Sequence, residues 1–368
     1  MAVKDRKVRI GIIGCGGIAN SHVKCYKLCD DVEIVAGADI VPGKARAFLD
    51  SYGLTEAKAF DNHKDLLELE LDGVSVCTYN TQHAPCVIDA LDKGVHVLCE
   101  KPMSVTLEEA VEMRKAELKS GKILTIGFQP RFGENMKLIK NIVNGGELGK
   151  VYYVQTGGGR RRGIPGRTFI EKKTAGVGVL ADIGCYGLDM ALNTIGYPKP
   201  LTVSAVTFDY FGKDPKYMGE KDAARFDVDD FAGAFIRLEG GITIDFRMSW
   251  AMHMDYMGDT MFLGTDAGLK VESPGKDGLW GGAWDGDVGP MTLFHDVGGK
   301  CVQTEIPSVA PKDEDKFYLK IKSFVDAIVN GESAPIPTSQ IIYNQAIIDG
   351  IRRSAELGKE VDIVIPEI

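Results

Sequence analysis

The sequence of 368 residues lacks several features that would direct it to particular classes of protein. It has no apolar run long enough to span a bilayer, and "MAVKDRKVRIGII" passes from a charged tail straight into a strand pattern, without the apolar core of a signal peptide. Internal repeats and low-complexity stretches are also missing. The formal net charge of -9 gives no general attraction for nucleic acid or an anionic membrane. We therefore expect neither a nucleic-acid-binding protein nor a membrane protein.

Paired cysteines and metal-ligand spacings are missing as well. The eight cysteines are scattered without a CxxC pair, and the six histidines show no spacing typical of metal ligands. Several cysteines, such as Cys77 and Cys99, lie inside apolar runs. We expect reduced, mostly buried thiols, a cytoplasmic location and no metal.

Two patterns divide the chain near residue 128. Up to that point the apolar runs "VRIGII", "VEIVAGAD", "GVSVCT", "HVLCEKP" and "ILTIGF" alternate with helical segments such as "HAPCVIDALDKG" and "TLEEAVEMRKAELKSG". Regular alternation of strand and helix predicts an α/β domain over 1–128, with a doubly wound parallel sheet covered by helices on both faces.

The remainder, 129–368, has the pattern of an α+β domain. The long runs "LTVSAVTFDYF", "FAGAFIRLEGGITIDFRMSW" and "DTMFLGTDAGLKVES" predict a large, mostly antiparallel sheet, with glycine breaks as hairpins. Two amphipathic helices over 316–358 end the chain, and we expect them to pack near the domain interface. We place Phe235, Ile244 and Phe246 on the open sheet face, where they are too apolar for water. A homo-oligomer (dimer, tetramer or hexamer) through that face follows.

A glycine motif follows the first predicted strand in "IGIIGCGGIAN". Gly14 permits a tight turn, Gly16 allows a pyrophosphate to approach the backbone, and Ala19 lets the helix pack closely on the strand. Gly17 and Ile18 lie at the helix N-terminus, whose amides face phosphate oxygens. Glycine-rich turns also have purely structural uses.

An acidic residue stands at the place where a dinucleotide site needs one. Asp39 ends the second predicted strand, about 20 residues after the motif, where a carboxylate accepts from a ribose 2'-hydroxyl. The alternative is that Asp39 caps a loop. Its charge favours NAD over NADP, although Lys44 and Arg46 lie close to it in the sequence.

The stretch "VLCEKPMSV" puts two charged residues at the end of a buried strand. Ligands of doubly wound sheets bind at the carboxyl ends of the strands, so Lys101 should project toward the nicotinamide end of the cofactor. The alternative is a surface lysine paired with Glu100. Pro102 favours the first interpretation, because it makes the segment rigid.

The chain resembles the glucose-fructose oxidoreductase, inositol dehydrogenase and MocA (Gfo/Idh/MocA) family of NAD(P)-dependent sugar dehydrogenases. The motifs that carry this resemblance include "GIIGCGGIA", "CTYNTQHAPCVIDALDKGVHVLCEKP", "GFQPRF", "GELGKVYYV" and "ADIGCYGLDMAL". It implies a Rossmann domain followed by a substrate-binding and oligomerisation domain. It also implies that Lys101 hydrogen-bonds the reacting sugar hydroxyl, that Glu100 orients it, and that the Lys-Pro peptide is cis.

Further motifs place residues around the cofactor by the same resemblance. Thr78, Asn80 and His83 match the T-P-N-x-x-H turn, with Tyr79 in place of the proline, and Gln129 and Arg131 match a "GFQ-x-R" turn that borders the site. His83 is equally consistent with a helix cap.

The second-domain motif D-x-G-x-H-x-x-D appears as Asp182, Gly184, Tyr186 and Asp189, with tyrosine at the histidine position. Tyrosine has an ordinary pKa of about 10, which a neighbouring lysine cation lowers. We expect Lys101 and Tyr186 to act together in proton transfer, and Asp182, at i, i+4 from Tyr186, to hold substrate hydroxyls. Spacing alone equally allows a packing tyrosine and a helix-capping aspartate.

The segment "GGGRRRGIPGRTF" predicts a loop over the substrate, in which Arg160, Arg161 or Arg162 binds hydroxyls or a carboxylate. Trp280 and Trp284 either stack on a sugar or fill an oligomer contact. The sequence thus predicts an NAD-dependent dehydrogenase for a secondary hydroxyl of a sugar, glycoside or polyol, with C3 of a glucoside as a special case. Two alternatives stay open: an NAD-dependent glycosidase that uses transient oxidation, and a non-catalytic NAD- or sugar-sensing regulator.

Overall fold

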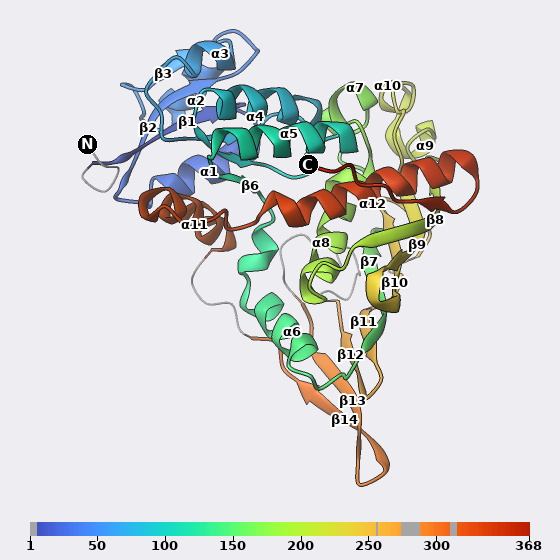
Figure 1. Ribbon diagram of the computed structural model, residues 1–368. Helices are drawn as coiled ribbons and strands as arrows, with labels where there is room; N and C mark the ends of the chain where they lie inside the picture. Colours follow the sequence, from blue (N-terminus) through green and yellow to red (C-terminus); the bar gives the residue numbers. More distant parts are fainter. Residues whose placement is uncertain (1–5, 255–256, 274–287, 310–314) are drawn as a thin grey trace. The chain divides into compact units, whose positions relative to one another are not determined.

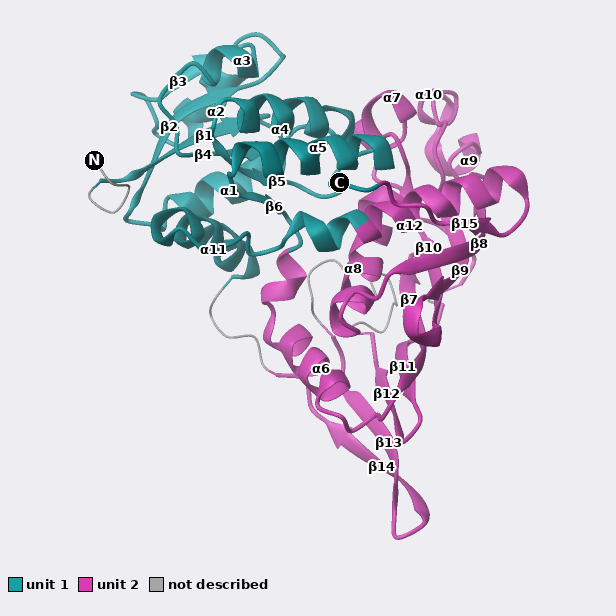
Figure 2. Cartoon of the chain, in the orientation of Figure 1, with its two compact units in different colours: residues 1–128, 313–342, 367–368 teal, residues 129–312, 343–366 magenta. Residues whose placement is uncertain are grey.

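The computed structural model describes residues 6–254, 257–273, 288–309 and 315–368. The chain forms two compact units (Figure 2): unit 1 comprises 1–128, 313–342 and 367–368, and unit 2 comprises 129–312 and 343–366. The sequence pattern placed everything after residue 128 in one domain. Residues 313–342 instead group with the first unit, which is therefore built from two distant parts of the chain.

Unit 1 contains a six-stranded parallel sheet in the order β3-β2-β1-β4-β5-β6. Its strands are β1 (Val8–Ile13), β2 (Val32–Ala38), β3 (Lys58–Phe60), β4 (Gly73–Val76), β5 (His96–Cys99) and β6 (Leu124–Ile126). The doubly wound parallel sheet is confirmed. The sequence pattern missed β3, because three residues are too few to show a period.

The helices of unit 1 include both segments that periodicity predicted (Figure 1). They are α1 (Ala19–Tyr26), α2 (Lys44–Ser51), α3 (His63–Leu66), α4 (His83–Asp92), α5 (Leu107–Ser120) and α11 (Lys316–Asn330). Helix α5 shows how local sequence sets such bounds. Thr106 and Glu109 form a reciprocal capping box at its start, and Gly121 ends it with a left-handed φ of 65°.

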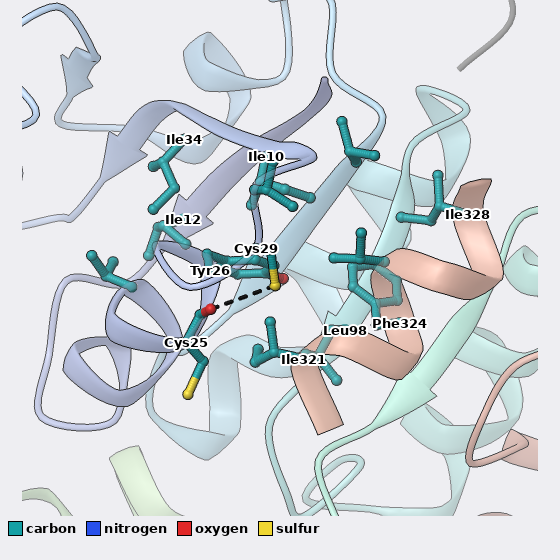
Figure 3. Packing of buried hydrophobic residues seen from close by; sticks show 14 of the residues in the cluster. Ile10, Ile12, Cys25, Tyr26, Cys29, Ile34, Leu98, Ile321, Phe324 and Ile328 are labelled. Atoms are coloured by element: carbon teal, nitrogen blue, oxygen red, sulfur yellow. Dashed lines mark hydrogen bonds between the residues drawn. The ribbon is translucent and has the colours of Figure 1, made fainter. Parts of the chain in front are cut away.

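Helix α11 supplies part of the core of unit 1. Ile321, Phe324 and Ile328 pack in one buried cluster with Ile10 and Ile12 of β1 (Figure 3). Burying a side chain of this size contributes about 1.5–3 kcal/mol relative to exposure. A helix from the far end of the chain thus completes the core of unit 1.

Unit 2 is built on a nine-stranded sheet in the order β14-β13-β12-β11-β7-β10-β9-β8-β15. Strand β10 runs parallel to β7, and the other neighbouring strands pair antiparallel, which confirms the mostly antiparallel prediction. The strands are β7 (Val151–Gly159), β8 (Pro200–Phe208), β9 (Phe231–Leu238), β10 (Ile242–Ser249), β11 (Thr260–Gly264), β12 (Ala267–Val271), β13 (Met291–Val297), β14 (Lys300–Ile306) and β15 (Val361–Asp362). The sequence pattern did not identify β13, β14 or β15.

The helices that belong to unit 2 are mostly short. They are α6 (Glu134–Asn144), α7 (Lys172–Ala175), α8 (Cys185–Thr194), α9 (Pro215–Met218), α10 (Glu220–Ala223) and the greater part of α12 (Thr338–Leu357). Helix α8 lies along β7, and all ten of its residues are buried.

The two faces of this sheet differ from the prediction in one respect. Phe235 is 41% exposed, as expected for the open face, but Ile244 and Phe246 are fully buried. Phe235 pairs with Asp245 in the β9–β10 register, so the residues on either side of Asp245 must point to the opposite face. The placement of Ile244 and Phe246 on the open face was wrong; Phe246 packs instead near Gly184 and Gly187, at the start of α8.

One described helical stretch, Lys172–Thr194, is long and apolar enough to cross a bilayer by length and composition, and 94% of its window is buried inside the protein. This differs from the sequence-based expectation that no apolar run is long enough to span a bilayer. Burial of this extent is what a core helix shows, so the finding is weak support for a membrane span. All eight cysteines are free thiols, of which Cys301 alone is exposed.

Candidate active site

The glycine loop joins β1 to α1 in unit 1. Gly14 has a φ of 89°, and a Cβ there would lie 2.7 Å from the backbone of Cys77, so only glycine fits. At Gly16 and Gly17 an added Cβ would meet nothing within 4 Å. The first glycine is thus required by the fold, whereas the next two leave open space beside the backbone.

Asp39 lies directly after β2 and is 8% exposed. One carboxylate oxygen accepts from the Cys15 backbone N–H at 3.0 Å and from Lys44 Nζ at 2.8 Å, and the other accepts from the Val41 N–H at 3.0 Å. Burial raises the pKa of Asp39, but the Lys44 bond and the two amides outweigh it and hold the pKa below its ordinary value. The side chain therefore carries a negative charge and also ties the glycine loop to β2.

These residues fit a bound dinucleotide. The open backbone at Gly16 and Gly17, followed by Ile18 and the first turn of α1 at Ala19, offers amides to a pyrophosphate. The buried hydroxyl of Thr78, after β4, has no hydrogen-bond partner among the residues that the structure describes. Asn80 follows it in a 3₁₀ turn, Asn80–Gln82, that leads into α4.

His83 opens α4 but does not cap it through its side chain. Its ring is buried, with Nδ1 2.7 Å from the carbonyl oxygen of Pro102 and Nε2 3.3 Å from that of Thr78. Burial lowers the pKa of His83, so the ring is neutral and has one N–H to donate, which the shorter contact takes. His83 thus fixes the loop that follows β5.

The charged pair Glu100–Lys101 directly follows β5. The Lys101–Pro102 peptide is cis, as the family resemblance implied, and Lys101 is half-buried. Glu100 is 4% exposed, and its Oε2 accepts from the backbone N–H of Lys101 at 3.3 Å. Its Oε1 accepts from His22 Nε2 at 2.7 Å and from Lys320 Nζ at 2.5 Å.

The corresponding residues of unit 2 gather around the start of α8. Leu180–Gly184 forms a π-helical turn, a feature frequent at functional sites, and α8 follows it at once. The hydroxyl of Tyr186 exchanges hydrogen bonds with Gln129, whose Nε2 donates at 2.9 Å and whose Oε1 accepts at 3.2 Å. Asp182 Oδ2 accepts from Trp250 Nε1 at 3.0 Å. Neither Tyr186 nor Asp182 is placed by packing alone.

Arg131 lies next to this group but is engaged in a buried ion pair. Its guanidinium makes two bonds to Asp189, at 2.9 and 2.6 Å, and one to Tyr197 Oη at 2.6 Å. Such a bidentate pair fixes both partners. Arg131 thus joins the end of the "GFQPRF" turn to Asp189 of α8 and to Tyr197.

The three arginines of the predicted loop behave differently. Arg160 donates to the Gly163 carbonyl at 2.7 Å, and burial lowers its pKa to about 10 while the Asp182 charge opposes the shift. Arg162 is exposed and stacks over the rings of Phe211 and Tyr217. Arg161 is exposed too. Trp280 and Trp284 lie outside the described residues.

Sequence reasoning missed two residues of these groups. Lys320 lies 220 positions from Glu100, and Trp250 lies 68 positions from Asp182. The sequence offers one signal for Lys320: a lysine at a position of α11 that the amphipathic pattern assigns to the buried face.

Two family models match the chain. Residues 8–128 match the model described as "Oxidoreductase family, NAD-binding Rossmann fold", and residues 136–270 match "GFO/IDH/MocA C-terminal domain". The chain belongs to the Gfo/Idh/MocA family. The two matched segments contain the glycine loop, the Glu100–Lys101–Pro102 segment and Tyr186.

Several relatives of the chain have named activities. D-glucoside 3-dehydrogenase of Escherichia coli (strain K12) is 29% identical over 370 residues, which cover 98% of this chain and 99% of that protein. Glucose-6-phosphate 3-dehydrogenase of Bacillus subtilis (strain 168) is 33% identical over 188 residues, 50% of this chain and 52% of that protein. Inositol 2-dehydrogenase of Salmonella typhimurium (strain LT2) is 36% identical over 146 residues, 39% of this chain and 43% of that protein.

Solved structures support the fold. Levoglucosan dehydrogenase in complex with NADH has a TM-score of 0.81 at 19% identity and covers 99% of this chain and 100% of that one. Aldose-aldose oxidoreductase from Caulobacter crescentus has a TM-score of 0.77 at 24% identity, with coverage of 97% and 100%.

Proposed function

We propose that this chain is an NAD-dependent dehydrogenase that transfers hydride between a secondary hydroxyl of a sugar, glycoside or polyol and NAD, with C3 of a glucoside as a candidate position. The observation that carries the proposal is the position of Lys101 after β5. It stands at the same end of the parallel sheet as the glycine loop after β1 and Asp39 after β2. The full-length likeness to D-glucoside 3-dehydrogenase supports the substrate class.

The chain's own residues handle the substrate and its proton in this proposal. NAD, when bound, accepts the hydride. Lys101 hydrogen-bonds the reacting hydroxyl, and Tyr186, oriented by Gln129, is the candidate base for the hydroxyl proton. Asp182 and Arg160 are candidates to hold the other hydroxyls of the substrate.

The preference for NAD over NADP rests on Asp39. Its negative charge opposes a 2'-phosphate, and of the two nearby cations only Lys44 pairs with it. Arg46 donates instead to the carbonyls of Ala57 and Leu54, at 2.7 and 2.9 Å. Comparing kcat/KM for the two cofactors tests this preference. Relative to wild type, Asp39→Ala should raise kcat/KM for NADP, and Lys44→Ala should lower kcat/KM for NADP.

The experiment for the activity is a screen of glucosides, free sugars and polyols with NAD, followed by NADH absorbance. Lys101→Met should lower turnover about 10²–10⁴-fold, with the Kd for NAD little changed. Lys93→Met, at a surface lysine of unit 1 paired with Glu68, is the matched control. A Lys101→Met protein with the wild-type rate would exclude the proposal. Free reducing sugar without net NADH would indicate the glycosidase, and NAD binding without any turnover would indicate the regulator.

We also propose a cytoplasmic homo-oligomer. The eight free thiols support a reducing compartment. The apolar side chains of Val206, Phe208 and Phe235, each 41–48% exposed on the open sheet face, support association of copies through that face.

A further inference from the structure

A cluster of buried charged and polar side chains lies beneath the Lys101 loop of unit 1. We call it the Glu100 cluster, and it consists of His22, Tyr26, Ser75, Glu100 and Lys320. Every member is at most 4% exposed. Helices α1 and α11 and strand β4 each contribute to it, and β5 ends at it.

The hydrogen bonds of the cluster have one consistent direction. Tyr26 Oη lies 2.8 Å from Ser75 Oγ, which lies 2.9 Å from His22 Nδ1. Burial and the Lys320 charge lower the pKa of His22, so its ring is neutral. The tyrosine therefore donates to the serine, the serine to Nδ1, and Nε2–H to the ionised Glu100.

The carboxylate of Glu100 is held on several sides. Lys320 Nζ and His22 Nε2 bind Oε1, and the backbone N–H of Lys101 binds Oε2. A Cβ on Gly127 would lie 2.9 Å from Oε1, so glycine at the end of β6 leaves room for this carboxylate. Glu100, the residue directly before Lys101, is thus anchored by Lys320 of α11, a helix near the far end of the chain.

Stability alone gives little reason for this arrangement. The desolvation of a buried ion pair can exceed its Coulombic gain, and apolar replacement of both partners is often neutral or stabilising. The ionised carboxylate of Glu100, with its charge balanced by Lys320, fixes the backbone next to Lys101.

We propose that Lys320 is a positioning residue for Lys101, acting through Glu100. Its ammonium anchors the carboxylate that binds the Lys101 backbone, and it balances the negative charge of that carboxylate. This inference rests on the proposed function, in which Lys101 contacts the reacting hydroxyl.

Other titratable groups also face Glu100. They are His22 on α1, Cys77 after β4, His83 on α4, and Cys99 and Lys101 on its own segment. Burial raises the pKa of Glu100, but the Lys320 charge and the His22 bond outweigh it and hold the pKa well below the ordinary value. Removing Lys320 takes away the largest of these lowering contributions, so Glu100 then either takes up a proton or leaves its charge on its neighbours.

Four proteins test the role of Lys320. Lys320→Met removes the cation, Lys320→Arg keeps it, and Glu100→Gln with Lys320→Met removes both charges. Lys322→Met is the matched control, because Lys322 lies on the same helix but is partly exposed and pairs with Asp326. Measurements are the pH dependence of kcat, the Kd for NAD, the melting temperature, and the pH dependence of Lys101 acetylation by acetic anhydride, read by peptide mass spectrometry.

In Lys320→Met we expect kcat to fall about tenfold or more, and the midpoint of Lys101 acetylation to rise by about half a pH unit or more. Lys320→Arg, the double variant and Lys322→Met should keep the wild-type midpoint. An unchanged acetylation midpoint and an unchanged kcat–pH profile in Lys320→Met would overturn the inference, even if the melting temperature fell. The acetylation readout needs no turnover, so it stands apart from a failure of the proposed function, which would appear as wild-type protein that forms no NADH with any sugar.

Discussion

At the scale of the residue, Tyr186 is a phenol with a defined partner. Both atoms of the Gln129 amide bond its hydroxyl, and the side chain is 4% exposed. A neutral amide can donate to a phenolate and accept from a phenol, so Gln129 can hold the hydroxyl in either protonation state.

Replacement of Tyr186 by phenylalanine removes the hydroxyl and keeps the packing. We expect Tyr186→Phe to lower kcat about 10²–10⁴-fold, with little change in the Kd for NAD measured by fluorescence titration. Tyr153→Phe is the matched control, since Tyr153 lies on β7 and bonds Asp245 on the open sheet face. Equal turnover in the two variants would exclude Tyr186 as the base.

Which site residues could be predicted depended on how far apart their partners lie in the sequence. Gly14, Asp39 and Lys101 each follow a strand directly, so local pattern and topology were enough to place them at one sheet edge. The bond that holds Asp39 to Cys15, the ion pair of Arg131 with Asp189, and the anchoring of Glu100 by Lys320 join distant positions. A single sequence carries no signal for such pairs beyond the type of residue.

At the scale of the element, the glycine loop contains one glycine that the fold requires, Gly14, and one that we expect only cofactor binding to require, Gly16. We expect Gly14→Ala to lower the free energy of unfolding, because the methyl group would meet the Cys77 backbone at 2.7 Å and the φ of 89° disfavours any side chain. Gly16→Ala meets nothing within 4 Å, so it should leave stability within about 1 kcal/mol of wild type while weakening NAD binding. Urea unfolding and NAD titration of both variants check this; a stable Gly14→Ala, or a Gly16→Ala with normal affinity, would contradict it.

The strands of unit 1 other than β3 were predictable because each is an apolar run bounded by turn residues. Strand β14 was not, since six of its seven residues are exposed and its sequence "KCVQTEI" has no apolar face. The misplacement of Ile244 and Phe246 has a different cause. The composition of β10 shows that one face is buried, but only the register with β9 shows which residues share the face of Phe235.

At the scale of the whole molecule, a buried carboxylate makes stability depend on pH. Asp230, 1% exposed, accepts from the Gly212 N–H at 2.7 Å, and burial raises its pKa from 3.8 to about 6. The folded protein thus binds this proton more tightly than the unfolded chain, so the stabilisation is complete below pH 3.8 and is lost as the pH rises through 6.

Asp230→Asn removes that titration. Relative to wild type, the variant should gain about 2–3 kcal/mol in free energy of unfolding between pH 4 and pH 7, as measured by urea denaturation at several pH values. Asp209→Asn, at a partly exposed aspartate paired with Lys213, is the control and should show a much smaller change. A constant difference for Asp230→Asn across this range would contradict the assignment.

The proposed association of copies through the open face of the unit 2 sheet can be tested by mutation. Glutamate in place of Phe208 and Phe235 should place charges in the contact between copies and lower the molar mass in solution, as measured by light scattering after size-exclusion chromatography. Tyr152→Glu is the control, because Tyr152 is 47% exposed but lies on the β7 face shared with buried Val154. An unchanged mass in the double variant would locate the contact elsewhere or show a monomer.

The return of α11 to unit 1 has a consequence for synthesis on the ribosome. Unit 1 cannot complete its core until Ile321 and Phe324 have been synthesised. The intervening residues, most of which belong to unit 2, are translated first, which at roughly 5–20 residues per second takes on the order of 10 seconds or more. During that interval the apolar side chains that pack against α11 stay uncovered, and Glu100 lacks its partner Lys320. Chaperones would have this apolar surface to protect. A polypeptide released before α11 is made would lack part of the core of unit 1 and the lysine that pairs with Glu100.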